Sequence, residues 1–247
     1  MKYKIGIFFT ALLFIINSLN AQKTIKFEEN FNKIIVSPHI ETVFKKGTTP
    51  SIVIEEISVP KEKFLYEIEN GTLQVYLEGA KTYTKNKKVV IRNQERKVPL
   101  YKNRVVKLTI TYTDVDTFSL RGEEKITFQT PLIQENCTLR MYGKPEVLIN
   151  TIKVDRFNVS IYGDSFLNIE KGTIQKQKIT AYGASKIMAS DVISKETKLT
   201  AYGNGTFQLN VSERIKVSSY GEATVLYKGT AKLKKGIVIG DATIKRM

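Results

Sequence analysis

The dipeptide Tyr-Gly recurs at a nearly constant interval through the second half of this chain. The tyrosines of the five pairs are Tyr142, Tyr162, Tyr182, Tyr202 and Tyr220. Gly122 and Gly240 extend the series at both ends without the tyrosine, and the interval between successive glycines stays close to twenty. Such a period without a helical pattern is typical of a stacked β-solenoid, in which no repeat can bury its apolar side chains without a neighbour. The repeat therefore predicts an all-β fold.

Aligning the repeats on their glycines separates the side chains into columns. The residues four and two before each glycine, and four and six after it, are mostly apolar, as Leu139 and Val147 are around Gly143. Successive residues of a strand point to opposite faces, so these columns predict the buried inner face. A third apolar segment in most coils, such as Ile152 and Val154 or Val192 and Ile193, favours three short strands per coil. Parallel crossovers are nearly always right-handed, so we expect a right-handed parallel β-helix over residues 113–247.

The recurring glycine most simply marks a corner of each coil. A residue without a Cβ permits positive φ and close approach of the backbone. Asp164, Asn204 and Glu222, directly after their glycines, suit turn chemistry.

The tyrosines precede the glycines by one residue and should therefore point outward. Coils in a solenoid stack about 4.8 Å apart, so the five rings should form one external column beside a column of mainly hydroxyl side chains. Aromatic rings stack on sugars and receive cations, so this column could bind an extended glycan. Alternatively, the stacked rings only cover the sheet and hold the register of the coils.

Residues 22–112 predict a region of short strands onto which the solenoid packs as one unit. Four runs rich in β-branched and aromatic residues are separated by turn signals, which favours antiparallel pairing. These runs are Ile34–Val36, Thr42–Phe44, Ser51–Ile54 and Gly71–Leu77. A clean alternation over Val106–Tyr112 predicts a half-buried strand that leads into the repeats.

Positive charge is concentrated in residues 81–104, where nine basic residues accompany one acid, Glu95. This segment is either a solvated, mobile insertion between two strands or an electrostatic docking surface. Its candidate contacts are Lys85, Lys87, Lys88 and Arg92. The charge favours polyanions such as an acidic polysaccharide or lipopolysaccharide phosphates. No pattern indicates specific recognition of nucleic acid.

The N-terminal segment Met1–Ala21 has the layout of a secretory signal peptide. Two lysines precede an apolar run over Ile5–Ile16, and cleavage is expected after Ala21. The run is shorter than the roughly 20 residues of a membrane span, and no later stretch approaches that length. Cleavage would remove two lysines but no acid, so the net charge would fall from +15 to +13. We expect an exported protein that is periplasmic, on the cell surface or secreted.

No catalytic, metal or cofactor motif emerges from the sequence. His39 is the only histidine and is expected in a loop, and Cys137 is the only cysteine and is expected in the core. Polysaccharide-cleaving enzymes need clustered carboxylates, whereas the acids of the repeats, such as Asp155 and Asp191, do not recur at one position. The leading hypothesis is a non-enzymatic interaction module without a cofactor. The alternatives are a polysaccharide lyase or hydrolase on the same scaffold, and an envelope component that stacks end to end.

Three motifs resemble a known family. They are Phe31–Val36 followed by Ile40–Gly47, then Glu69–Val75, and then the strand Thr109–Tyr112 before the glycine-marked coils. On these motifs the chain resembles the putative auto-transporter adhesin, head GIN domain family of secreted bacterial proteins, common in Bacteroidetes. The resemblance covers essentially all of the mature chain. It implies a β-helical, extracytoplasmic, adhesin-like protein and assigns no functional residue. The chain departs from the family in its Tyr-Gly pairs, where family coils often show Ser-Gly or Gly-Ser, and in its basic segment.

Overall fold

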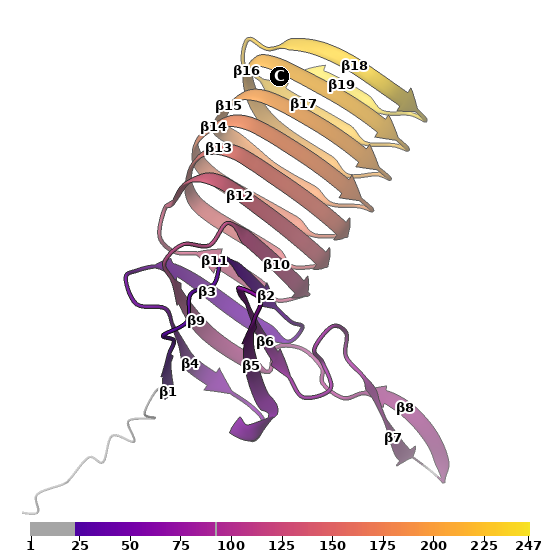
Figure 1. The fold of residues 1–247 in the computed structure, drawn as a ribbon. Coiled ribbons are helices and arrows are strands. Elements are labelled where there is room, and N and C mark those ends of the chain that lie inside the picture. The colour runs from indigo at the N-terminus through magenta and orange to yellow at the C-terminus, as the bar shows by residue number, and fades with distance from the viewer. Residues whose placement is uncertain (1–22, 92) are drawn as a thin grey trace, which may run out of the picture.

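The computed structural model describes residues 23–91 and 93–247, and most of them lie in β-strands. The expected signal peptide and Arg92 lie outside the described residues. The strands form a stack of coils, and a separate hairpin projects from its base (Figure 1). The single helical element in the described ranges is the 3-10 turn η1 (Lys61–Lys63).

The stack contains ten strands that follow one another along the chain. They are β10 (Thr117–Gly122), β11 (Lys125–Phe128), β12 (Leu132–Gly143), β13 (Glu146–Gly163), β14 (Phe166–Tyr182), β15 (Lys186–Tyr202), β16 (Thr206–Tyr220), β17 (Thr224–Lys228), β18 (Lys232–Ile239) and β19 (Thr243–Arg246). Every pairing among them is parallel and offset by one coil, so that Tyr162 lies opposite Tyr182. The prediction of an all-β solenoid, in which each glycine-marked repeat forms one coil, is confirmed.

A full coil is one long bent strand, where the sequence predicted three short ones. In β13, burial alternates along three segments but changes phase at Asn150–Thr151 and at Asp155–Arg156. The pairing with β14 skips only one residue at each of these bends. The backbone stays extended there and keeps its hydrogen bonds to the next coil, so the strand ends only at the glycine corner.

The predicted inner columns are buried. Leu139, Val159 and Leu167 are each at most 2% exposed. Ile193 was expected in the third apolar segment, but it is 51% exposed, because it stands between the buried residues Val192 and Ser194 and therefore points outward, like Thr173 opposite it. Cys137 is a core residue, as predicted, and its burial raises the pKa of the thiol well above the ordinary range.

The N-terminal strands continue the stack downward. They are β1 (Lys23–Lys26), β2 (Lys33–Val36), β3 (Ile40–Lys46), β4 (Ser51–Ile57), β5 (Phe64–Glu69), β6 (Thr72–Leu77) and β9 (Val106–Tyr112). β2 pairs in parallel with β10 above and β6 below, and β3 does the same with β11 and β9. Among these strands the pairs β1–β4, β4–β9 and β5–β6 are antiparallel, so the antiparallel expectation is wrong for β2 and β3. Alternation of apolar residues defines a strand's buried face but not the direction of its partner.

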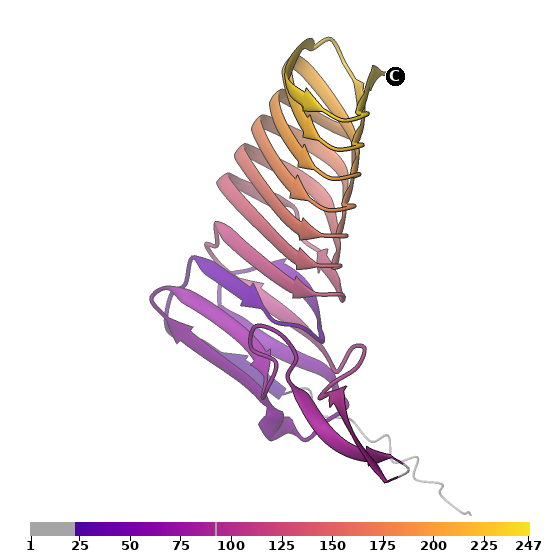
Figure 2. The ribbon, with the colours of Figure 1, turned by 90° about the vertical axis from the view of Figure 1, so that its right-hand side faces the viewer.

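The basic segment folds as a hairpin of β7 (Asn86–Ile91) and β8 (Gln94–Pro99). The two strands form their own sheet and point away from the coils (Figure 2). Lys87, Lys88 and Lys97 are all exposed on this hairpin.

Candidate binding face

The glycine corners fix where each tyrosine stands. Gly183 and Gly203 have φ values of +105° and +120°, a conformation that side chains with a Cβ rarely adopt. A Cβ on Gly203 would lie 2.8 Å from the carbonyl oxygen of Gly183 in the coil below. The backbones of the corner glycines therefore stack directly on one another. The side chain of the residue before each glycine projects from the coil at the same edge.

The five tyrosines form the external column that the sequence predicts. Ring centroids of successive tyrosines from Tyr142 to Tyr220 are 5.2, 5.0, 4.6 and 4.8 Å apart. The ring planes are within 4° to 7° of parallel. Tyr162, Tyr182 and Tyr202 keep 45%, 38% and 36% of their surface exposed.

The faces of these rings are turned toward each other. The guanidinium of Arg121, which occupies the tyrosine position of its coil, lies 5.8 Å from the ring centroid of Tyr142. At the other end of the column, Ile239 lies opposite Tyr220. A ligand therefore meets mainly ring edges and phenol hydroxyls, which favours hydrogen bonding over the face stacking suggested by the sequence.

A second column of hydroxyl side chains runs beside the tyrosines. Ser160, Thr180, Thr200 and Ser218 pair in register and are partly exposed. They stand two residues before the tyrosines, at a distance of about 6.6 Å along an extended strand. The two columns present donors and acceptors once per coil on the same face.

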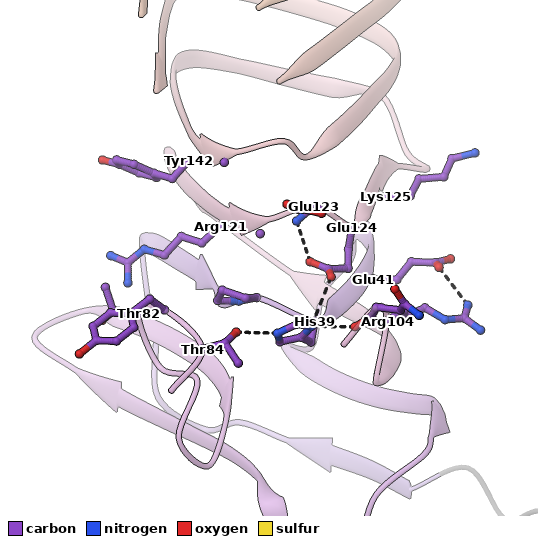
Figure 3. Close-up of a pocket in the computed structure, with 15 residues that line it drawn as sticks. His39, Glu41, Thr82, Thr84, Arg104, Arg121, Glu123, Glu124, Lys125 and Tyr142 are labelled. Atoms are coloured by element: carbon purple, nitrogen blue, oxygen red, sulfur yellow. Dashed lines mark hydrogen bonds and ion pairs between the residues drawn. The ribbon is translucent and has the colours of Figure 1, made fainter. Parts of the chain in front are cut away.

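The tyrosine column leads into a pocket of about 640 Å³ at the base of the solenoid (Figure 3). Arg121 and Tyr142 line it from the coil corners, and Tyr83 and Thr84 line it from the segment before the hairpin. The carboxylate of Glu124 also lines it, and accepts a hydrogen bond from the backbone N–H of Glu123 at 3.0 Å. The pocket thus lies between the tyrosine column and the base of the hairpin. Nothing in the sequence indicates that these two candidate binding regions adjoin.

His39 is the loop histidine that the sequence predicts, with a φ of 73° in the turn between β2 and β3. Its Nδ1 donates to the carbonyl oxygen of Asn103 at 2.7 Å, and its Nε2 lies 2.6 Å from the hydroxyl of Thr84. Glu124 is 3.8 Å from Nδ1. The imidazole therefore connects the two chain segments that flank the hairpin.

Sequence reasoning did not assemble this pocket. His39 is far in the sequence from Arg121 and Glu124, and none of the three belongs to a spaced motif. Alignment on the glycines does give one signal, because Arg121 precedes Gly122 where later coils have tyrosine. Within the described ranges, no group of three His, Cys, Asp or Glu side chains is arranged to hold a metal ion.

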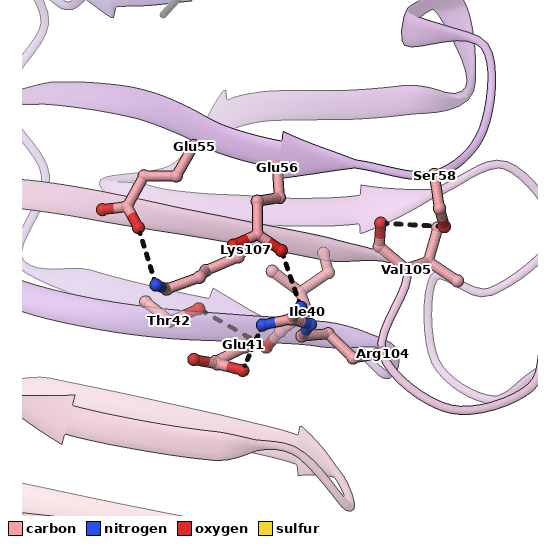
Figure 4. Close-up of polar contacts among 9 residues, drawn as sticks. All are labelled: Ile40, Glu41, Thr42, Glu55, Glu56, Ser58, Arg104, Val105 and Lys107. Atoms are coloured by element: carbon pink, nitrogen blue, oxygen red, sulfur yellow. Dashed lines mark hydrogen bonds and ion pairs between the residues drawn. The ribbon is translucent and has the colours of Figure 1, made fainter.

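The cations at the edges of the basic segment have acidic partners. Arg104 lies 2.9 Å from Glu41 and 2.6 Å from Glu56 (Figure 4), and its hydrogen bond to Glu41 raises the pKa of the guanidinium. Lys81 lies 2.5 Å from Glu67, and its hydrogen bond lowers the pKa of that carboxyl.

The candidate residues of the hairpin itself are more open. Lys88 pairs with Glu95 at 3.0 Å, at an exposed position. Lys85 and Lys87 are exposed and form no ion pair among the described residues. Within residues 81–104, the described cations that are exposed and lack an acidic partner therefore lie on the hairpin strands and at Lys85 and Lys102 on either side of them.

Solved structures of similar fold support the architecture. A protein described as a putative adhesin from Bacteroides fragilis has a TM-score of 0.72 and 20% sequence identity, over 92% of this chain and 98% of that one. A second putative adhesin, from Parabacteroides merdae, has a TM-score of 0.65 and 17% identity, over 92% and 95% of the two chains. A putative lipid binding protein from Parabacteroides distasonis has a TM-score of 0.63 and 15% identity, over 92% and 98%.

The sequence comparisons assign the family. No curated protein matches the chain. No helix within the described part of the chain is long and apolar enough to cross a membrane. The family described as putative auto-transporter adhesin, head GIN domain, matches residues 30–231, and the chain belongs to this family.

Proposed function

We propose that this protein is an exported, non-enzymatic interaction module that holds an extended glycan along the face formed by the tyrosine and hydroxyl columns. The observation that carries the proposal is the in-register column from Tyr142 to Tyr220. One phenol and one hydroxyl per coil match a ligand that repeats along a line. The adhesin description of the family and the signal-peptide layout of the N-terminus agree with a surface role.

Binding is favoured over cleavage of a polysaccharide. A lyase or hydrolase needs acidic or basic groups that are available to the substrate. In the pocket at the base, Glu41 is paired with Arg104 and both imidazole nitrogens of His39 have hydrogen-bond partners. These contacts hold chain segments together and leave those groups engaged.

The test separates the hydroxyls from the rings. Replacing Tyr162, Tyr182 and Tyr202 with phenylalanine keeps the stacked rings and removes three phenol groups. A net hydrogen bond contributes about 1 kcal/mol, so affinity for a glycan selected from an array of linear oligosaccharides should fall about 100-fold. The melting temperature should stay within a few degrees. The matched control is Tyr66→Phe, at an exposed tyrosine outside the column.

Serine at the same three positions should lower both stability and binding, since it removes the aromatic stacking. Glycan affinity that is unchanged in the triple phenylalanine variant would contradict the proposed site. The tyrosine column would then act only in holding the coils in register.

A further inference from the structure

A column of lysines runs along the same face as the tyrosines. Its members are Lys178, Lys198, Lys216 and Lys234, which pair in register from β14 to β18. All four are exposed, and none forms an ion pair within residues 23–91 and 93–247. Lys178, Lys198 and Lys216 stand two residues before the hydroxyl column, so lysine, hydroxyl and tyrosine follow one another along these three strands.

A second, mixed column lies beside the lysines at the bend of each coil. It contains Lys176, Glu196, Arg214 and Lys232 in register. Glu196 and Arg214 form an ion pair at 2.5 Å. The two columns border a groove of about 460 Å³.

The floor of this groove is partly polar. Gln177 and Thr197 line it, and both are buried, at 5% and 3% exposure. The hydroxyl of Thr197 donates to the side-chain oxygen of Gln177 at 3.3 Å and lies 3.0 Å from the hydroxyl of Ser194. In the coil below, Phe157 occupies the same position. The polar floor therefore begins where the lysine column begins.

An uninterrupted column of lysines is unfavourable for the isolated protein. Like charges directly opposite each other on neighbouring strands destabilise a sheet, and coils stacked about 4.8 Å apart keep these charges close. Another outward column on this solenoid mixes its residue types, running Lys125, Glu146, Phe166, Lys186, Thr206. A ligand whose negative charges repeat along the solenoid axis would relieve the repulsion.

We infer that this groove binds a linear acidic polysaccharide, whose carboxylates pair with the lysine column while its hydroxyls face the serine, threonine and tyrosine columns. The inference rests on the proposed function and names the class of glycan. The chain would lie parallel to the solenoid axis, because the cations repeat in that direction. From Lys178 to Lys234 the column spans three coil intervals, or about 14 Å.

The surrounding residues favour a polysaccharide over nucleic acid or a membrane. Single-stranded nucleic acid is held by stacking of bases on aromatic faces, and the tyrosine faces here are covered by each other. Interfacial binding to a membrane typically buries an apolar face in the lipid, as amphipathic helices do. The columns beside the lysines carry hydroxyls on one side and charged side chains on the other.

The direct test uses oligomers of polygalacturonate, a linear chain of uronic acids, with affinity measured by calorimetry on the full protein. The variant changes Lys178, Lys198, Lys216 and Lys234 to glutamine. Losing several charge contacts to a polyelectrolyte should weaken binding about 10-fold or more at low salt. Arginine at the same positions should retain binding. Affinity for the wild type should rise with oligomer length until the oligomer spans the groove.

The matched control removes the same charge elsewhere. Its four exposed lysines are Lys153, Lys171, Lys186 and Lys245. The affinity of this variant for polygalacturonate should stay within about twofold of the wild-type value, since long-range charge effects are screened. Equal losses in both glutamine variants would show a net-charge effect and overturn the inference. The inference would also be overturned if the protein bound single-stranded DNA or anionic phospholipid vesicles more tightly than polygalacturonate, and lost that binding in the glutamine variant of the lysine column.

Failure here is distinguishable from failure of the proposed function. Neutral glycan binding that depends on the tyrosine hydroxyls, with polygalacturonate affinity unchanged in the lysine variant, would leave the proposed function and refute this inference. Polygalacturonate binding that depends on the lysines but not on the tyrosine hydroxyls would support the groove and refute the tyrosine face.

Discussion

Replacing Gly203 with alanine should destabilise the protein by about 2–4 kcal/mol, the combined cost of backbone strain and a steric clash. The φ of +120° is strained for any residue with a Cβ, and a backbone held in such a region costs about 1–3 kcal/mol. The added Cβ would also lie 2.8 Å from the carbonyl oxygen and 3.2 Å from the carbonyl carbon of Gly183. These atoms belong to a hydrogen-bonded coil that cannot rotate away, so the coils must separate locally. Alanine also restricts the unfolded chain more than glycine does, but this offsets only about 0.4–1 kcal/mol of the loss in stability.

The assay is urea unfolding followed by far-ultraviolet circular dichroism, with the free energy of unfolding obtained by linear extrapolation. The control is Asn204→Ala, at the exposed corner residue next to Gly203. It should change stability by less than about 0.5 kcal/mol, as surface substitutions usually do. A loss below about 1 kcal/mol for Gly203→Ala, the lower end of the strain cost, would refute the claim that the corners require glycine.

Stacking of the corners adds a second, sharper expectation. Alanine at both Gly183 and Gly203 should destabilise the protein by less than the sum of the two single changes. Once the coils have moved apart locally to admit one Cβ, there is more room for the second. Alanine at Gly143 and Gly203, which lie three coils apart, should be additive within about 0.5 kcal/mol.

Three further experiments test the interior and the charge network. The buried hydroxyl of Tyr112 has no hydrogen-bond partner among the described residues, so Tyr112→Phe should raise the free energy of unfolding by about 1 kcal/mol, and a loss would indicate an unseen partner. The Cys137 thiol should react with a disulfide reagent only after unfolding, because burial raises its pKa; rapid labelling of the native protein would contradict this. The hydrogen bond from Thr109, with the hydrogen bond and charge of Lys107, lowers the pKa of Glu55 despite partial burial. The stabilisation is therefore present above the ordinary carboxyl pKa of about 4.3 and is lost as the pH falls through the lower folded value. Glu55→Gln should be less stable than wild type at neutral pH and equal to it in strong acid, and a difference that persists in acid would exclude the carboxylate as its source.

The coil architecture was predictable because its information is local and repeated. Each repeat places an apolar residue, a tyrosine and a glycine at fixed offsets, so an alignment of the chain on itself gives both faces of the sheet. The lysine column was available in the same way, since a lysine stands five positions before Gly183, Gly203 and Gly221. The apolar and tyrosine offsets predict the two faces of the sheet directly, whereas a surface lysine is ordinary until its neighbours in space are known.

Other features depend on pairing between distant segments. β2 and β3 have the alternation of any half-buried strand, and nothing in their residues says that β10 and β11 will lie directly above them. The pocket has the same origin, since the segments that carry His39 and Glu124 meet only through that pairing. Such long-range contacts carry no periodic signal, and a single sequence cannot reveal them.

One coil of the solenoid is shorter than the others, and the place where its residues are missing bears on the proposed binding face. The interval from Gly203 to Gly221 is shorter than the interval from Gly183 to Gly203. The missing residues are accommodated by register shifts between Ala189 and Ile193 and between Ser194 and Glu196. Beyond those shifts, Lys198 lies opposite Lys216 and Tyr202 lies opposite Tyr220. The irregularity between β15 and β16 therefore falls before the lysine, hydroxyl and tyrosine columns, and it ends at the pair Glu196–Arg214 beside the groove. In β18 a shift does fall within the face, between Val217 and Ser219, and there the tyrosine column ends in Ile239. A solenoid that needed only a stable core could place its irregular residues on any side, so the position of the shifts between β15 and β16 agrees with a face whose regular spacing is used in binding up to Tyr220.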